Sequence, residues 1–496
     1  MLTKQRPPYH IQLFGMPAPF IMKEKFFNAV KGGKSVRFRL GLALPMILAL
    51  AVFAAACTGG SGGGSSESGG GSSSPAAGKE EVVKLKFLYW GSNEEKKAVE
   101  SMIKSFNESH SNIQVVGEHV PGDYNTKINT LMASNELPDV AYLPDALASQ
   151  WGIEGRLLDF TPYMDENQDL KNRVPLSFYY SEPGKPAGFS TAAEVMVLYY
   201  NKDLFDEAGL PYPPAEADKA WTWEEFVEVA RKLTKDSSGR TALDDGFDPN
   251  NIVQFGFSFD SDRASWGPFL ASNGGDITDE TGTQYALNSP EAVEVFQALQ
   301  DLVFKYHVSP SLVQQQNLPN NNIRLQTRKV AMVIDGTWSL LDMSQTDMNF
   351  GIGVLPKFKE PKTMYIAGAS VIFSTTKYPK EAIEFYKYHN NPQQVDLYKI
   401  GLWMPVELKY YEDPQLIESW TNGGVHPPEF KTAAMDYLLN NAVISPSASL
   451  KNWPDIKTKM QPALDKIFTN AQPVQEVLDE LAADLQPLLQ GKYPSE

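Results

Sequence analysis

The globular part of the chain opens with VVKLKFLYW (82–90), NEEKKAVESMIKSFNE (93–108) and IQVV (113–116). The first segment alternates before it ends in aromatic residues, as a sheet strand does, and the third is a second short strand. The middle segment carries apolar residues at helical spacing, and Asn93 is its expected N-cap. Another helix is expected over 125–135, before a strand at DVAYL (139–143). This alternation predicts an open parallel α/β sheet, in which ligands bind beyond the carboxyl ends of the strands.

The same alternation continues through the rest of the chain. Thr222 and Glu225 predict a capping box at the start of the helix TWEEFVEVARKLT. Strands are expected at 195–200, 330–334 and 350–355, and helices at 290–305, 380–390 and most of 429–490.

Length and composition fit two lobes of ordinary size. The chain has 496 residues, of which 42% are hydrophobic and 21% charged, as in soluble globular proteins. Its formal net charge is -16, although the first 56 residues are basic. Because phosphate binding needs clustered lysine and arginine, the composition argues against a nucleic-acid partner.

The N-terminal 78 residues have the pattern of an export signal followed by a tether. A basic stretch (31–39) precedes an apolar run (40–56), which predicts a signal peptide over 1–56. Cys57 is the single cysteine, and the small residues before it resemble the lipobox of bacterial lipoproteins, which implies acylation of Cys57. The Gly/Ser-rich residues after it make 57–78 a flexible anchor segment. Release by ordinary signal peptidase, an uncleaved anchor, and Met22 as the true start remain alternatives.

Nine blocks, in order over about residues 82–490, resemble the maltose-binding-protein-like group of extracellular solute-binding proteins. They are the strand ending in Trp90, ASNELPDV (133–140), GRLLDFTPYMDE (155–166), LYYNKDLFDEAGLP (198–211), the TWEEF helix, NGGDI (273–277) with SPEAV (289–293), VAMVIDGTW (330–338), GVLPKFK (353–359), and Gly368-Ala369-Ser370 before KEAIEFYKY.

The resemblance implies a two-lobed α/β fold of the periplasmic-binding-protein type with a three-crossing hinge and a ligand between the lobes. The crossings are expected near 190–196, 352–358 and 399–405. Lobe 1 would then comprise 79–193 and 357–400, and lobe 2 would comprise 194–356 and 401–496. The implied protein is a monomer, lipid-anchored on the outer face of the cell membrane, that delivers a carbohydrate to the membrane permease subunits of an ABC importer.

A sugar site needs aromatic platforms for C–H faces and polar groups for hydroxyls. The resemblance implies ligand contacts for Trp338, Trp453 and Trp266, while Trp90 ends the first strand and Trp403 lies at the third crossing. Polar candidates are Asp145, which follows a strand, Glu194 at the hinge, Asn93 and Glu95 after the first strand, Tyr124, and Asn273. The alternative for each tryptophan is core packing, and for each polar residue a helix cap or a solvated surface group.

Motifs for other chemistry are absent from the sequence. It contains no zinc-ligand spacing and no nucleotide-binding glycine motif, and outside the Gly/Ser-rich tether it contains no GxSxG. The acidic loop 243–251 leaves a calcium ion open as an alternative. We therefore predict no catalytic residue, no metal site and no cofactor. A receptor for a non-sugar solute, or a glycoside hydrolase using two cleft carboxylates, are the alternatives to a sugar receptor.

Overall fold

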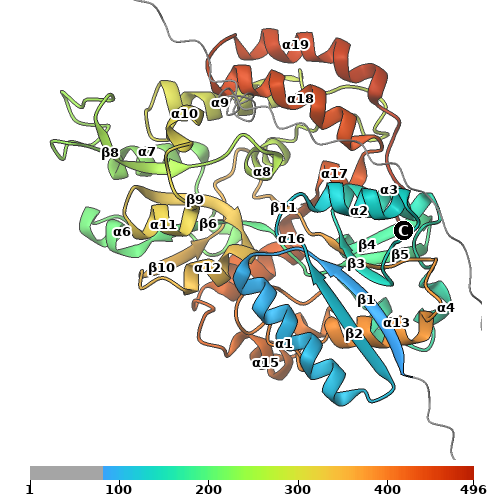
Figure 1. The fold of residues 1–496 in the computed structure, drawn as a ribbon. Coiled ribbons are helices and arrows are strands. Elements are labelled where there is room, and N and C mark those ends of the chain that lie inside the picture. The colour runs from blue at the N-terminus through green and yellow to red at the C-terminus, as the bar shows by residue number, and fades with distance from the viewer. Residues whose placement is uncertain (1–81) are drawn as a thin grey trace, which may run out of the picture. The chain divides into compact units, whose positions relative to one another are not determined.

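The computed structural model describes residues 82–496, so the predicted signal peptide, Cys57 and the tether lie outside the described residues. Within this described part, no helix combines the length and apolar character needed to cross a membrane. The described residues form two α/β lobes, each built on its own sheet (Figure 1). The predicted two-lobed fold is therefore confirmed.

The first lobe is built on a six-stranded sheet of the order β2-β1-β3-β12-β5-β4. Its strands are β1 (Val83–Tyr89), β2 (Ile113–His119), β3 (Val140–Leu143), β4 (Phe178–Glu182), β5 (Lys185–Ser190) and β12 (Ala369–Ile372). β1 pairs in parallel with β2 and β3, whereas β12, β5 and β4 add antiparallel. The sheet is mixed, and the predicted parallel arrangement holds only for the strands from residues 82–143.

Helices cover both faces of this sheet because its strands alternate apolar side chains to either side. Phe87 packs in one core with α1 (Asn93–Ser109) and α13 (Pro379–His389), and Leu88 packs in another with α2 (Tyr124–Ala133) and α3 (Asp145–Ile153). The short helices α4 (Thr161–Met164) and α5 (Gln168–Lys171) follow. The predicted N-cap of α1 is wrong by one residue. Ser92 caps the helix, because its side chain and that of Glu95 form a capping box.

The second lobe is built on a five-stranded sheet of the order β10-β6-β9-β8-β7. The predicted capping box of Thr222 and Glu225 is confirmed at the start of the helix Trp223–Leu233. The strands are β6 (Met196–Asn201), β7 (Lys235–Asp236), β8 (Ile252–Ser258), β9 (Val330–Gly336) and β10 (Phe350–Gly353). The helices are α6 (Lys202–Ala208), α7 (Trp223–Leu233), α8 (Arg263–Ser272), α9 (Pro290–Phe304), α10 (Leu312–Gln315), α11 (Asn321–Gln326), α12 (Leu340–Ser344), α18 (Trp453–Phe468) and α19 (Val474–Leu485).

Short strands and loops connect the two sheets. The chain passes from β5 to β6, and from β10 through β11 (Thr363–Tyr365) to β12. β11 pairs in parallel with β13 (Ala442–Ile444), so β13 interrupts the region predicted as mostly helical. The remaining α-helices of the described residues are α14 (Lys409–Glu412), α15 (Pro414–Thr421), α16 (Tyr437–Asn441) and α17 (Pro446–Ser449). The residue-level lobe boundaries stay predictions.

Candidate ligand-binding site

A pocket of about 310 Å³ lies where the two sheets meet. Trp338, which follows β9 of the second lobe, faces residues that follow the strands of the first lobe. The lining consists of Trp90, Glu95, Val99, Tyr142, Thr191, Glu194, Trp338, Ile366, Gly368, Leu402 and Trp403. The structure therefore brings Trp90, Glu95, Glu194, Trp338 and Trp403 together, although they are spread over more than 300 positions of the chain.

Two glycines allow the indole rings at this pocket to lie flat against the backbone. A Cβ atom at Gly368 would lie 2.5 Å from Cζ2 of Trp90, and one at Gly336 would lie 2.2 Å from the ring of Trp338. Contacts this short do not occur, so any side chain at either position would displace the indole. The sequences DGTW and Gly368-Ala369-Ser370 thus place two aromatic platforms on opposite lobes.

Trp403 and Tyr142 form a buried aromatic wall of the pocket. Trp403 is 6% exposed, and its ring meets those of Tyr142 and His389 with centroid distances of 6.1 and 5.1 Å. The Tyr142 hydroxyl shares a 2.8 Å hydrogen bond with Nε2 of His389. Burial lowers the pKa of His389 to about 3, so this imidazole is neutral and holds Tyr142 in place without bringing a charge to the pocket.

Two carboxylates, Glu95 and Glu194, face the same pocket. Burial raises the pKa of Glu194 well above its ordinary value, and the charge of Glu95 raises it further. Burial also raises the pKa of Glu95, an effect that the backbone N–H of Ser92 opposes. Among residues 82–496, no protein donor hydrogen-bonds the Glu194 carboxylate, and no lysine, arginine or histidine lines the pocket. The Glu194 carboxylate is therefore available to a ligand, whereas one oxygen of Glu95 already accepts from the Ser92 N–H.

Asp145 lies outside this pocket and joins the two lobes through protein contacts. Its carboxylate accepts hydrogen bonds from Arg263 Nη2 of α8, at 3.3 Å, and from the Ser447 hydroxyl. Arg263 also donates from Nε to Ser445 Oγ at 3.0 Å and lies over the Trp453 ring, 5.7 Å from its centroid. In this arrangement, the carboxylate of Asp145 compensates the charge of Arg263.

The other predicted residues also lie away from the pocket lining. Trp266 is 1% exposed and donates to the Ser261 carbonyl oxygen, within the core of the second lobe. Asn273 ends α8 and donates to the carboxylate of Glu294. Tyr124 packs edge-on against Trp90 and donates to the Tyr142 carbonyl oxygen. Asn93 is exposed at the start of α1, and Trp453 is 4% exposed at the start of α18.

The sequence analysis missed several lining residues. Tyr142 lies within β3, and the sequence does not distinguish it from other strand residues. Thr191 and Ile366 lie in loops that have no periodic pattern. Leu402 adjoins Trp403, so the segment around that tryptophan was a usable signal. Backbone hydrogen bonds to distant residues fix the position of this segment. The Ala193 N–H donates to the Met404 carbonyl oxygen, and the Val174 N–H donates to that of Val406.

An aromatic pocket with an unpartnered carboxylate between two lobes is typical of a bilobed solute-binding protein. The described residues contain no group of three or more histidine, cysteine or acidic side chains suited to a metal ion. In the loop 243–251, donors of Thr241 satisfy the Asp244 carboxylate, and those of Asn250 and Asn251 satisfy Asp248.

Residues 101–423 match the family described as bacterial extracellular solute-binding protein, and the chain belongs to that family. The sn-glycerol-3-phosphate-binding periplasmic protein of Brucella abortus is 26% identical over 412 residues, covering 78% of this chain and 88% of the relative. The multiple sugar-binding protein of Streptococcus mutans is 24% identical, covering 66% of this chain and 76% of the relative.

Solved structures show the same fold. An ABC substrate-binding protein of Listeria monocytogenes in complex with cycloalternan aligns with a TM-score of 0.70 at 22% identity, covering 82% of this chain and 99% of that one. A maltose-bound binding protein of T. maritima aligns with a TM-score of 0.67 at 20% identity, covering 82% and 100%.

Proposed function

We propose that this chain captures a carbohydrate in the pocket between its lobes and delivers it to the permease subunits of an ABC importer. The observation that carries this proposal is the pairing of Trp90 and Trp338, on opposite lobes, with the unpartnered carboxylate of Glu194. Indole faces match the C–H faces of a sugar ring, and carboxylates accept hydrogen bonds from its hydroxyl groups. A ligand that touches both lobes stabilises the closed arrangement, which a permease can recognise.

A phosphorylated ligand is the second candidate, because the glycerol-3-phosphate-binding relatives are similar over most of their length. The charge of the pocket opposes it. Phosphate needs cationic or backbone N–H partners, whereas the pocket presents the acidic side chains of Glu95 and Glu194, and no cation lines it in the described residues. Arg263, the first residue of α8, is a cation of the second lobe, but its guanidinium is already paired with Asp145.

A thermal-shift experiment separates these candidates. Residues 79–496 would be heated with glucose, galactose, their α1,4-, β1,4- and α1,6-linked disaccharides, or sn-glycerol-3-phosphate. We expect at least one sugar to raise Tm, because a ligand at 100 times its Kd stabilises the native state by about 2.7 kcal/mol. Stabilisation by sn-glycerol-3-phosphate alone, or by no member of the panel, contradicts the proposed function.

We further propose that acylated Cys57 holds the protein at the outer face of the cell membrane, as a monomer. The observations behind this are the apolar run that ends at the single cysteine and the Gly/Ser-rich segment that follows. Cys57→Ala is expected to move the protein from the membrane fraction to the medium, or to leave the precursor unprocessed. A Cys57→Ala protein that is processed and still pellets with membranes argues against lipid attachment; Ser61→Ala, in the tether, is the matched control.

A further inference from the structure

Arg263 and Asp145 belong to a ring of hydrogen-bonded side chains that joins the two lobes. Arg263 is the first residue of α8 in the second lobe, and Asp145 is the first residue of α3 in the first lobe. Arg263 donates from Nη2 to Asp145 Oδ2 at 3.3 Å and from Nε to Ser445 Oγ at 3.0 Å. Ser445 and Ser447 share a 2.8 Å hydrogen bond, and the Ser447 hydroxyl donates to Asp145 Oδ2, which closes the ring.

The two serines of the ring are packed with the first lobe. Ser445 precedes α17 and Ser447 lies within it. Ala448 of the same helix belongs to the apolar core that contains α3, and Ser149 of α3 donates to the Ala448 carbonyl oxygen at 2.8 Å. Arg263 is therefore the member of the ring that the second lobe supplies, and its guanidinium meets three partners fixed on the first lobe.

This contact removes two opposite charges from water. The side chain of Arg263 is 15% exposed and that of Asp145 is 10% exposed. Both helices begin beyond the carboxyl ends of strands, β3 and β8, so the contact lies on the side of the lobes where the pocket opens. Separating the lobes would return both charges to water. Removing one partner would instead leave the other charge buried without its counter-ion, which is strongly unfavourable.

The local structure of α8 does not by itself favour an arginine at its first position. A cation in the first turn of a helix opposes the helix dipole. The N-cap is Asp262, whose side chain accepts from the Ala264 N–H at 3.1 Å. Asp262 Oδ1 also lies 3.6 Å from Arg263 Nη1, but the carboxylate nearest to the guanidinium is that of Asp145. The arginine is thus matched to a partner on the other lobe.

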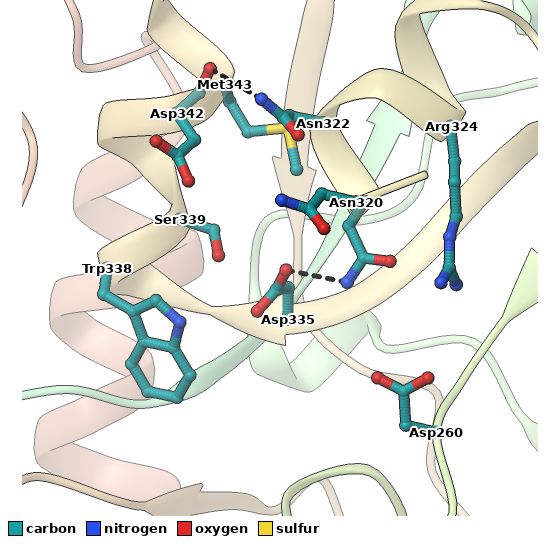
Figure 2. Close-up of a pocket in the computed structure, with 10 residues that line it drawn as sticks. Asp260, Asn320, Asn322, Arg324, Asp335, Trp338, Ser339, Asp342 and Met343 are labelled. Atoms are coloured by element: carbon teal, nitrogen blue, oxygen red, sulfur yellow. Dashed lines mark hydrogen bonds between the residues drawn. The ribbon is translucent and has the colours of Figure 1, made fainter. Parts of the chain in front are cut away.

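A second charged contact between the lobes has the opposite sign. Figure 2, a close-up of the second lobe around Trp338, shows the Asp342 carboxylate without a hydrogen bond to the other residues drawn. Burial raises the pKa of Glu95 on the first lobe, and the charge of Asp342 raises it further. Burial and the charge of Glu94 likewise raise the pKa of Asp342. The carboxylates of α1 and α12 therefore repel each other, and the pair of Asp145 and Arg263 counteracts that repulsion.

We propose that Asp145, Arg263, Ser445 and Ser447 form an interlobe latch that holds the lobes together before any ligand binds. Arg263 does not line the pocket, so it is a positioning residue, which keeps the two lobes at the separation that a ligand needs. Less of the binding free energy is then used to close the lobes. The latch acts in the ligand-free protein and so goes beyond the proposed function, whereas its effect on ligand affinity rests on that function.

The test measures the distance between the lobes in the absence of ligand. Residues 79–496 contain both sheets and no cysteine, so two introduced cysteines can each carry one spin label. Ser101→Cys on α1 and Val313→Cys on α10 place the labels at exposed positions of the two lobes. Double electron–electron resonance then reports the distribution of distances between them.

Arg263→Met and Asp145→Asn are each expected to give a longer mean distance than the labelled parent protein. Arg328→Met is the matched control, because Arg328 pairs with Glu207 within the second lobe, and it should leave the distance unchanged. Circular dichroism and Tm report the folding of each variant. An unchanged or shorter distance in the folded variants overturns the latch.

The double variant Arg263→Met/Asp145→Asn tests the pair itself. Both single changes remove the same contact, so the double variant should lengthen the distance no further than the single ones do. Additive lengthening overturns the latch. Ser447→Ala breaks the ring without unpairing a charge and is expected to lengthen the distance as well. If neither charge variant folds, an unchanged distance in Ser447→Ala overturns the latch.

Ligand kinetics separate the latch from the proposed function. The best sugar of the thermal-shift panel is expected to dissociate about 10-fold faster from Arg263→Met than from the wild type, because the lobes open more readily. Faster dissociation with an unchanged ligand-free distance overturns the latch, while carbohydrate capture stands. A longer ligand-free distance in a protein that binds no sugar of the panel supports the latch, while the proposed function fails.

Discussion

Trp338→Ala is expected to weaken binding of the best sugar about 30-fold and to leave the protein folded. Trp338 lines the pocket and is only partly buried; its ring packs against the edge of both cores, so we expect its removal to cost some stability without unfolding the protein. Truncating a large rigid contact of this kind commonly costs about 2 kcal/mol or more of binding free energy, which corresponds to about 30-fold in Kd. Calorimetric titration of the variant measures the loss, and its circular dichroism spectrum reports the fold.

The matched control is Trp221→Ala, because Trp221 is also partly buried but does not line the pocket. We expect this variant to bind as the wild type does. If Trp338→Ala binds with wild-type affinity, the ligand does not stack on this indole. If the variant unfolds, Trp338 is a packing residue. Gly336→Ala then serves as a second probe, since it displaces the same ring without removing it.

The fold was largely predictable because its elements are marked locally. The alternating residues of β1, the periodic apolar face of α1 and the capping box of α7 each follow from a few neighbouring residues. What escaped prediction depends on distant partners. β11 and β13 have three residues each and exist because they pair with each other across nearly 80 positions. The antiparallel addition of β12 to β3 likewise has no local signal.

The same distinction applies to the site. Trp90 and Trp338 were predictable because each follows the carboxyl end of a strand, which is where α/β sheets bind ligands. Asp145 follows a strand as well, but Arg263 from the other lobe, Ser447 and the Ala146 N–H donate to its carboxylate. Trp266 lies on a helix whose inward face could not be told from its outward face by sequence.

The stability of the protein should depend on pH through Glu194. Its pKa in the folded state lies well above the ordinary value, because burial and the charge of Glu95 disfavour the ionised form. The unfolded chain therefore releases this proton at lower pH than the folded protein does. Between the ordinary pKa and the raised one, the folded state binds more protons, so stability falls as pH rises. Above the raised pKa the loss is complete and constant.

Glu194→Gln is expected to raise the stability of the ligand-free protein at pH 7.5 and to change it little near pH 4. A pKa that differs by one between the folded and unfolded states corresponds to about 1.4 kcal/mol of stability, and 1 kcal/mol raises Tm by about 2 °C or more in a lobe of this size. The neutral amide removes the cost of a charge that is partly buried and has no protein donor among the described residues. Thermal unfolding across pH 4–8 measures the difference, with the exposed Glu412→Gln as control.

A Glu194→Gln protein that parallels the wild type at every pH would show that the carboxylate is solvated rather than buried. Destabilisation at pH 7.5 would instead show that the charge has a partner in the protein. If Glu194 binds the ligand, we expect Glu194→Gln to be more stable than the wild type and to bind sugar more weakly, since functional sites commonly trade stability for function.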